Sequence, residues 1–402
     1  MTAQLRTPQM GELEHIKVHG ETEVGWCALT LPNETVDDAG RPFVREKGFS
    51  AADPRAPKRR VYDDPEVHAL REHLRAHNGI QGLEILEPHE VERAARIFFR
   101  DGFVVVRDVL NSGQLETFRS ASAAVLKKIL QIPGVGGRKY LTESYRLPHR
   151  YSYGTASASR HLLHDPVWAS MIDLPTTTPI LTRIFGGADY KVLGAGGDLC
   201  LPGAIEYQAL HTDGDREHFQ MPPARIEQAR RLGIEPGANA GEQDIRGFHR
   251  VIERTPPVVT INFLMTDMTW ENGPIRQIPG TQARAGHPPS PMDEPEWMRL
   301  STVVGAPAGA AIFRDTRAWH GGTPNLSREI RAMPNVEYMA PWYEDANFQP
   351  AMPYEIWAGL SAHAQQISLA TRFPSGVWPA GAGVMHPLAS ERRAAKEKKT
   401  VP

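Results

Sequence analysis

The chain has 402 residues, enough for one large domain or two, and its 41% hydrophobic and 23% charged residues are ordinary for a globular protein. A formal net charge of −2 without a clustered basic face argues against nucleic acid as the main partner, because phosphate contacts need grouped lysines and arginines. The chain has no apolar run of 18 residues, so we expect no membrane span. Its first residues lack the apolar stretch of a signal peptide, and only two cysteines are present, so we expect no disulfide framework. These features together predict a cytoplasmic location.

The first 85 residues are expected to form an N-terminal extension. Residues 1–60 are polar and rich in Gly, Pro, Asp and Arg, with Trp26 and Leu31 as candidate anchors. The sequence leaves open whether this stretch wraps the core or is partly disordered. The main domain is expected over residues 86–385, and a basic, solvated tail over residues 386–402.

Helices are expected before strands along the main domain. Residues 88–101 predict a helix because small and apolar side chains recur along one face, and Gly102 ends it. Residues 103–106 are apolar and mostly β-branched, which predicts a strand. Two further helices are expected over about residues 112–129 and 177–186.

From about residue 190 the pattern changes to short strands between Gly and Pro turns. Such spacing is typical of a double-sheet antiparallel barrel, with the preceding helices packed outside it. The expected fold is therefore mainly β with flanking helices around a double-stranded β-helix core of jelly-roll, cupin-like type. The expected strands lie at about residues 190–193, 205–212, 258–265, 310–313 and 336–339.

An insertion is expected between about residues 214 and 257, where the strand pattern stops. Loops longer than roughly 12–15 residues inside a compact domain are usually functional or disordered. A lid over a nearby site and a plain surface insertion are both consistent with this segment. His218 within it is a candidate for lining a substrate space.

Two histidines and one aspartate form a candidate metal site. In a β-strand, side chains at i and i+2 share a face, so His211 and Asp213 can bind one metal ion while Thr212 points away. His320, far later in the chain, would supply the third ligand from another strand. This ligand set holds Fe(II) on one face and leaves other positions open. One H-x-D match is also expected by chance in a chain with 16 histidines, so the residues around the motif must decide whether it binds a metal ion.

Four blocks of residues surround this candidate site. They are residues 98–106 (FFRDGFVVV), the segment with Pro202-Gly203-Ala204, Gln208 and His211-Thr212-Asp213, residues 271–281 (ENGPIRQIPGT), and the segment with Arg314-Asp315, Trp319-His320, Pro324-Asn325 and Arg331. The blocks resemble the phytanoyl-CoA dioxygenase-like family, in that family's order from about residue 90 to 340. The resemblance implies a jelly-roll oxygenase in which His211, Asp213 and His320 hold the iron.

The resemblance also implies the cofactors and the reaction. Fe(II), 2-oxoglutarate as co-substrate and O2 would couple the decarboxylation of 2-oxoglutarate to succinate and CO2 with hydroxylation or desaturation of a C–H bond. Halogenases of this type carry a small residue instead of the metal-binding carboxylate, so Asp213 argues against halogenation. The alternative is a cupin-like jelly roll that binds a small ligand without oxygenase activity, against which the full ligand set and Arg331 argue.

Arg331 is the expected partner of the distal carboxylate of 2-oxoglutarate, because a guanidinium can bind a carboxylate through two hydrogen bonds. Arg328 competes, but the two arginines would face opposite ways if a strand begins at Arg331. Pro334 predicts an edge or bulge in that strand, since proline lacks a ladder donor. Gln208 and Thr323 are further co-substrate candidates. By strict alternation Gln208 would face away from the metal ligands, so a bulge or a backbone-bracing role is the alternative.

Arg276, Trp270 and Trp319, together with His218, are candidates for contacting the substrate. Arg276 could instead brace its loop, and a tryptophan beside a metal ligand could instead pack in the core. The expected partner is a small molecule, and the oligomeric state stays open, a homodimer included. Acyl-CoA thioesters, amino acids, terpenoids, alkaloids and polyketides all remain open as substrates, and the breadth of the family favours secondary metabolism.

Overall fold

The computed structural model describes residues 62–130, 150–154, 162–213, 256–283, 287–345, 348 and 350–377, together with Trp26 and four short strands before residue 45. The expected insertion except its last two residues, Leu31 and the basic tail lie outside these described residues. Within them, no helix is both long and apolar enough to cross a membrane. The expected domain boundaries at residues 86 and 385 stay predictions.

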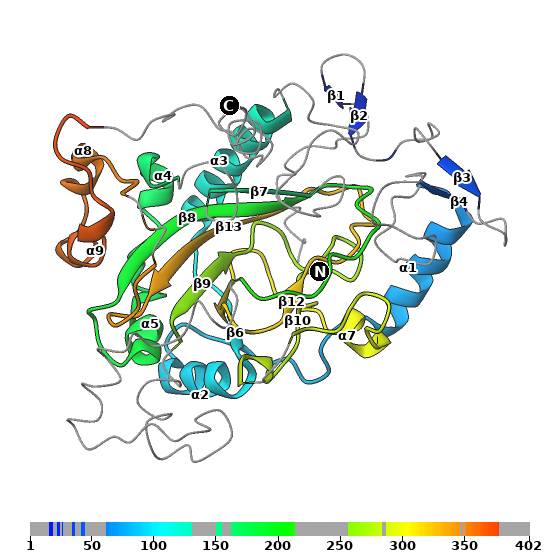
Figure 1. The fold of residues 1–402 in the computed structure, drawn as a ribbon, viewed down its shortest axis with the longest axis horizontal. Coiled ribbons are helices and arrows are strands. Elements are labelled where there is room, and N and C mark those ends of the chain that lie inside the picture. The colour runs from blue at the N-terminus through cyan, green and yellow to red at the C-terminus, as the bar shows by residue number, and fades with distance from the viewer. Residues whose placement is uncertain are drawn as a thin grey trace, which may run out of the picture.

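One seven-stranded sheet forms the centre of the molecule (Figure 1). Its strands pair antiparallel, except that β5 and β6 are parallel. Strands with apolar, β-branched sequences occupy its middle, as the sequence predicts. In order across the sheet the strands are β5 (Ile85–Leu86), β6 (Phe103–Val106), β11 (Ala311–Asp315), β9 (Val258–Phe263), β13 (Arg331–Met339), β8 (Lys191–Cys200) and β7 (Arg150–Tyr153).

A second, smaller sheet pairs β10 (Arg276–Gln277) with β12 (His320–Gly321). An isolated antiparallel bridge adds His211 to the other side of His320. The two sheets complete the predicted jelly-roll core with its flanking helices. The strand expected over residues 205–212 is wrong, because the segment forms no regular strand and is joined to the β12 region by a bridge at His211 and a hydrogen bond from the Gln208 N–H to the Gly322 carbonyl.

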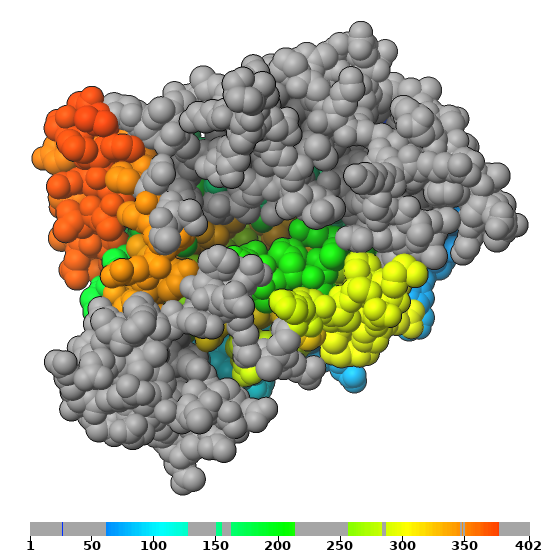
Figure 2. Space-filling view, in the orientation of Figure 1, coloured from blue at the N-terminus to red at the C-terminus, as the bar shows by residue number. Residues whose placement is uncertain are grey.

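Helices surround the sheet as predicted. The three expected helices are present with slightly different ends, and Figures 1 and 2 show α8 and α9 at one end of the molecule with α1 and α7 at the other. The helices are α1 (Pro65–His77), α2 (Val91–Asp101), α3 (Ser112–Leu130), α4 (Pro166–Ala169), α5 (Thr178–Phe185), α7 (Glu296–Leu300), α8 (Tyr354–Trp357) and α9 (Ala362–Ile367).

Helix α2 shows how local sequence sets an element. Its small and aromatic residues Ala94, Ala95 and Phe98 are buried on one face. Gly102 has a φ of +82°, the left-handed conformation that glycine adopts without strain, and its N–H donates to the Phe98 carbonyl. The chain then turns directly into β6, the strand predicted over residues 103–106.

Side chains alternate across the large sheet and so divide it into two faces. On β6, Val104 and Val106 pack into the main core with α2, α3 and α5, while Phe103 and Val105 point to the opposite face. On β13 the opposite face carries Arg331, Met333, Asn335 and Glu337. The helix side of the sheet is therefore apolar, and polar groups gather on the side that faces the small sheet.

Pro334 lies in an interior strand, so the expected edge is wrong. Strand β13 lies between β9 and β8, and Pro334 is paired with Gly197 of β8. The pairing of β13 with β9 begins only at Asn335, one residue after the proline. A bulge is present in β13, but it falls at Glu337/Tyr338. The strand itself begins at Arg331.

Trp26 and helix α1, two described parts of the N-terminal extension, contact the turn between His320 and Arg331. Two short pairs, β1 (Ile16–Val18) with β2 (Thr22–Val24) and β3 (Glu34–Val36) with β4 (Pro42–Val44), precede α1. Trp26 is buried, as an anchor should be, and its indole donates to the Ser327 carbonyl at 2.8 Å. Arg71 of α1 donates to the Leu326 carbonyl and stacks on Tyr62 at 3.8 Å. The extension thus holds this turn from outside.

Candidate metal centre

The structure brings His211, Asp213 and His320 together, with one ligand atom from each lying within 4.8 Å of the others. The two histidines face one another across a backbone pair, with N–H to carbonyl distances of 3.0 and 3.1 Å in the two directions. Their ring centroids are 4.3 Å apart. The Asp213 N–H donates to Thr316, which holds the third ligand beside the pair.

The hydrogen bonds of the two imidazoles leave the correct nitrogens for a metal ion. Nδ1 of His211 lies 3.0 Å from the Ala209 carbonyl, and Nδ1 of His320 lies 3.0 Å from the Ala318 carbonyl and 3.3 Å from Nη1 of Arg314. The two carbonyls are the nearer partners and can only accept, which favours a proton on each Nδ1 and leaves each Nε2 with its lone pair. The Nε2 atoms lie 3.8 and 3.3 Å from Oδ1 of Asp213. This donor set fits Fe(II).

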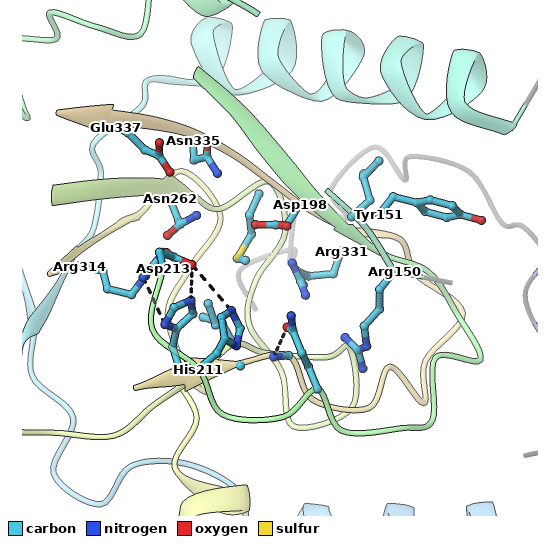
Figure 3. Close-up of a pocket in the computed structure, with 17 residues that line it drawn as sticks. Arg150, Tyr151, Asp198, His211, Asp213, Asn262, Arg314, Arg331, Asn335 and Glu337 are labelled. Carbon is cyan, nitrogen blue, oxygen red and sulfur yellow. Dashed lines mark hydrogen bonds and ion pairs between the residues drawn. The ribbon is translucent and has the colours of Figure 1, made fainter. Parts of the chain in front are cut away.

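Arg314 contacts the carboxylate of the candidate metal ligand Asp213. It lies on β11, is 4% exposed, and contacts Oδ2 of Asp213 at 2.6 Å (Figure 3). Burial opposes ionisation of Asp213, but Arg314 and the two imidazoles hold the pKa of this carboxyl well below its usual range. Asp213 is therefore ionised and oriented across the neutral pH range. Sequence reasoning gave Arg314 no role, because nothing in its own neighbourhood indicates the Asp213 contact.

A cavity between the two sheets contains the metal ligands and Arg331. Figure 3 shows His211 and Asp213 at one side, Arg331 and Arg150 at the other, and Asn262 and Asn335 above them. The lining residues are Arg150, Tyr151, Asp198, Leu199, Gln208, His211, Asp213, Asn262, Ile275, Arg314, His320, Gly321, Gly322, Arg331, Met333, Asn335 and Glu337.

Arg331 and Arg328 lie in different environments. Arg331 lines the cavity, is 3% exposed, and donates Nε to the Gly273 carbonyl at 3.0 Å. Its Nη1 has no hydrogen-bond partner within the described chain. Arg328 is exposed, and its guanidinium lies 4.1 Å from the centre of the Tyr62 ring, outside the cavity. Of these two arginines, Arg331 is the one placed to receive a ligand carboxylate in the cavity.

The other two co-substrate candidates brace the backbone. Gln208 lines the cavity, and its Oε1 accepts the Gly322 N–H at 3.0 Å. Because its segment is not a regular strand, the alternation that would turn it away from the metal does not apply. The Thr323 hydroxyl donates to the Pro274 carbonyl at 2.6 Å, and Thr323 is not among the cavity-lining residues.

The described substrate candidates lie outside the cavity. Arg276 is fully buried, with hydrogen bonds to the Glu294 carboxylate and the Gln208 carbonyl, which favours the bracing role. Trp319 packs in a small apolar cluster, and Trp270 packs with the cluster around Trp26. These positions favour core packing for both tryptophans. His218 lies outside the described residues.

The Arg276–Glu294 pair gives a test of this bracing role. Burial lowers the pKa of Arg276 and raises that of Glu294, while each charge opposes the shift of the other. Glu294→Ala would leave a buried guanidinium without its counter-charge, and we expect a loss of about 3–5 kcal/mol in unfolding free energy. Urea unfolding measures it. Glu296→Ala, which removes an exposed partner of His73, is the control and should change stability little. Equal small losses in both variants would contradict the bracing role.

Arg150 was missed by sequence reasoning. It lies on β7, lines the cavity, and comes from a stretch in which no motif stands out. Asn262, which sequence reasoning named only as a weaker co-substrate candidate, lines the cavity as well, and its Oδ1 has no partner within the described chain. Both positions depend on the strand order of the large sheet.

The chain belongs to the phytanoyl-CoA dioxygenase (PhyH) family, whose model matches residues 98–333, more than half of the chain. The match spans all three metal ligands and Arg331. The family's cofactors are Fe(II), 2-oxoglutarate and O2, and the ligand set described above fits them.

Several solved structures are similar in part. AviO1 from Streptomyces viridochromogenes Tue57 is 18% identical with a TM-score of 0.41, over 64% of this chain and 98% of that one. SnoK, a non-heme α-ketoglutarate-dependent carbocyclase from nogalamycin biosynthesis, is 19% identical with a TM-score of 0.40, over 64% and 90%. The epimerase SnoN, in complex with Fe3+, α-ketoglutarate and nogalamycin RO, is 16% identical with a TM-score of 0.36, over 63% and 84%.

Proposed function

We propose that the protein is an Fe(II)/2-oxoglutarate-dependent dioxygenase that oxidises a C–H bond of a small organic substrate, by hydroxylation or desaturation. The observation that carries this is the meeting, in one cavity, of a two-histidine, one-carboxylate ligand set and a buried arginine whose Nη1 has no partner among the described residues. Substrate oxidation would accompany the conversion of 2-oxoglutarate and O2 to succinate and CO2.

The iron, once bound with 2-oxoglutarate and O2, supplies the oxidising power that no side chain of the protein has. His211, His320 and Asp213 would hold the ion, and a set of only three protein ligands leaves room for 2-oxoglutarate and O2 to bind. Arg314 keeps the Asp213 carboxylate ionised and oriented. Arg331 would bind the distal carboxylate of 2-oxoglutarate, where low exposure strengthens the charged hydrogen bond.

A small-molecule substrate, a role in secondary metabolism and a cytoplasmic location are parts of the same proposal. The cavity supports a small molecule, because it lies between two sheets and not along an open surface. The low cysteine content supports a reducing compartment.

Purified protein should consume 2-oxoglutarate slowly without added substrate and form succinate in equal amount, only when Fe(II) and O2 are both present. Succinate measured by mass spectrometry, with Zn(II) replacing Fe(II) as control, tests this. A protein that binds Fe(II) and 2-oxoglutarate but forms no succinate would instead support the ligand-binding jelly roll.

A further inference from the structure

A second buried guanidinium lies beside Arg331 at the end of the cavity away from the metal ligands. Three adjacent strands place it there. In the register of the sheet, Arg150 of β7 is directly opposite Cys200 of β8, and Cys200 is directly opposite Arg331 of β13. Residues opposite one another on neighbouring strands share a face, so both arginines project toward the small sheet. Figure 3 shows them side by side.

Neither guanidinium has a salt bridge within the described chain. Arg150 is 5% exposed, and its Nη1 donates to Sγ of Cys200 at 2.9 Å. Its Nη2 contacts the carbonyl oxygens of Ala204, Glu206 and Thr323 at 3.3, 2.8 and 2.5 Å. These acceptors are neutral, and Nε has no partner in the described residues.

Two buried cations side by side are costly unless anions compensate them fully. Burial lowers the pKa of Arg331 and the charge of Arg150 lowers it further, while Cys200 and the Asp198 carboxylate, which also lines the cavity, oppose this shift. Desolvating one such charge costs several kcal/mol when no counter-charge compensates it. An anionic group of a ligand entering this end of the cavity would be attracted by both guanidiniums at once.

The absence of a side chain at Gly322 leaves room for the Arg150 guanidinium. It lines the cavity two residues after the metal ligand His320. A Cβ atom at this position would lie 2.6 Å from Nη1 and 3.3 Å from Cζ of Arg150. Any other residue would therefore displace the Arg150 guanidinium, which is held by four hydrogen-bond acceptors.

We propose that Arg150 acts with Arg331 to bind the distal carboxylate of the 2-oxo acid, and so selects a dicarboxylate over a 2-oxo monocarboxylate. This rests on the proposed function, because it takes 2-oxoglutarate as the ligand of the cavity. Arg150 would supply a positive charge and its Nε–H as a hydrogen-bond donor to the carboxylate, while Arg331 would supply its Nη1–H. The anion site would therefore be formed by both arginines.

The test compares two ligands that differ only in the distal group. 2-Oxopentanoate has the chain length of 2-oxoglutarate but a methyl group in place of the distal carboxylate. Affinities of both are measured without oxygen, from the charge-transfer absorbance that a 2-oxo acid gives on binding Fe(II) in the protein. Arg150→Met should weaken 2-oxoglutarate binding about 10-fold, while 2-oxopentanoate binding changes less than about 2-fold. Arg331→Met should show the same selective loss, and Arg119→Met, a buried arginine on α3 that donates to Met265, should show none.

The outcomes separate this inference from the proposed function. If the unmodified protein binds no 2-oxoglutarate, the proposed function fails and this inference fails with it. If Arg331→Met loses selectivity and Arg150→Met does not, or if Arg150→Met weakens both ligands equally, only the role of Arg150 is overturned. Should Arg150→Met not fold by circular dichroism, Gly322→Ala serves instead, because it displaces the guanidinium without removing it. Unchanged selectivity in Gly322→Ala would then overturn the inference.

Discussion

Replacing His211 or Asp213 with alanine should abolish iron binding and turnover. Each change removes one of the three ligand atoms that lie within 4.8 Å of one another. Asp213→Ala has a second consequence, because it leaves the buried Arg314 guanidinium without its partner at 2.6 Å. An uncompensated cation beside the site would repel a divalent ion, in addition to the lost ligand.

Iron per chain after anaerobic loading and desalting, together with succinate formation, measures this effect. Asp189→Ala and His89→Ala change an exposed residue of each ligand type away from the cavity, and both should keep the iron content of the unmodified protein. Full activity in either ligand variant would show that the metal site has been assigned to the wrong residues.

Replacing Arg331 with alanine should raise the apparent KM for 2-oxoglutarate about 10- to 100-fold, because a hydrogen bond to a charged group contributes roughly 1.5–3 kcal/mol. The physical reason is the position of Arg331 in the cavity, with Nη1 unpartnered in the described chain. The effect should appear mainly in the KM for 2-oxoglutarate, since the metal ligands are untouched.

Arg328→Ala is the matched control, three residues earlier in the same segment. Its guanidinium stacks on Tyr62 at the surface, so its loss should leave the KM for 2-oxoglutarate unchanged. A raised KM in Arg328→Ala with a normal value in Arg331→Ala would reverse the assignment of the two arginines.

Local sequence was sufficient for elements whose ends and faces depend on near neighbours. The helix ending at Gly102 and the strand at residues 103–106 follow from side-chain spacing and from the conformational freedom of glycine. The candidate metal ligands could also be proposed from the sequence, because His211 and Asp213 are two residues apart. The structure has no strand there, and instead the bridge from His211 to His320 and the hydrogen bond from the Asp213 N–H to the Thr316 carbonyl position the two residues.

The roles of other residues, Arg276 and Arg314 among them, depend on ion pairs that could not be predicted from the sequence. Arg276 and Glu294 are 18 positions apart in the chain, and nothing local distinguishes Arg276 from a substrate-binding arginine. Arg314 meets Asp213 only after β11 has been placed in the large sheet. The same holds for Pro334, whose interior position depends on which strands flank β13.

The sequence by itself determined the ligand chemistry, the family resemblance and the order of helices and strands, because these depend on residue type and short-range spacing. Only the tertiary structure decided which arginines reach the cavity. Arg150 and Arg331 are neighbours through the register of β7, β8 and β13, while Arg328 is turned outward onto Tyr62. Strand register and the packing of the N-terminal extension depend on contacts between distant parts of the chain, and local sequence patterns do not predict such contacts.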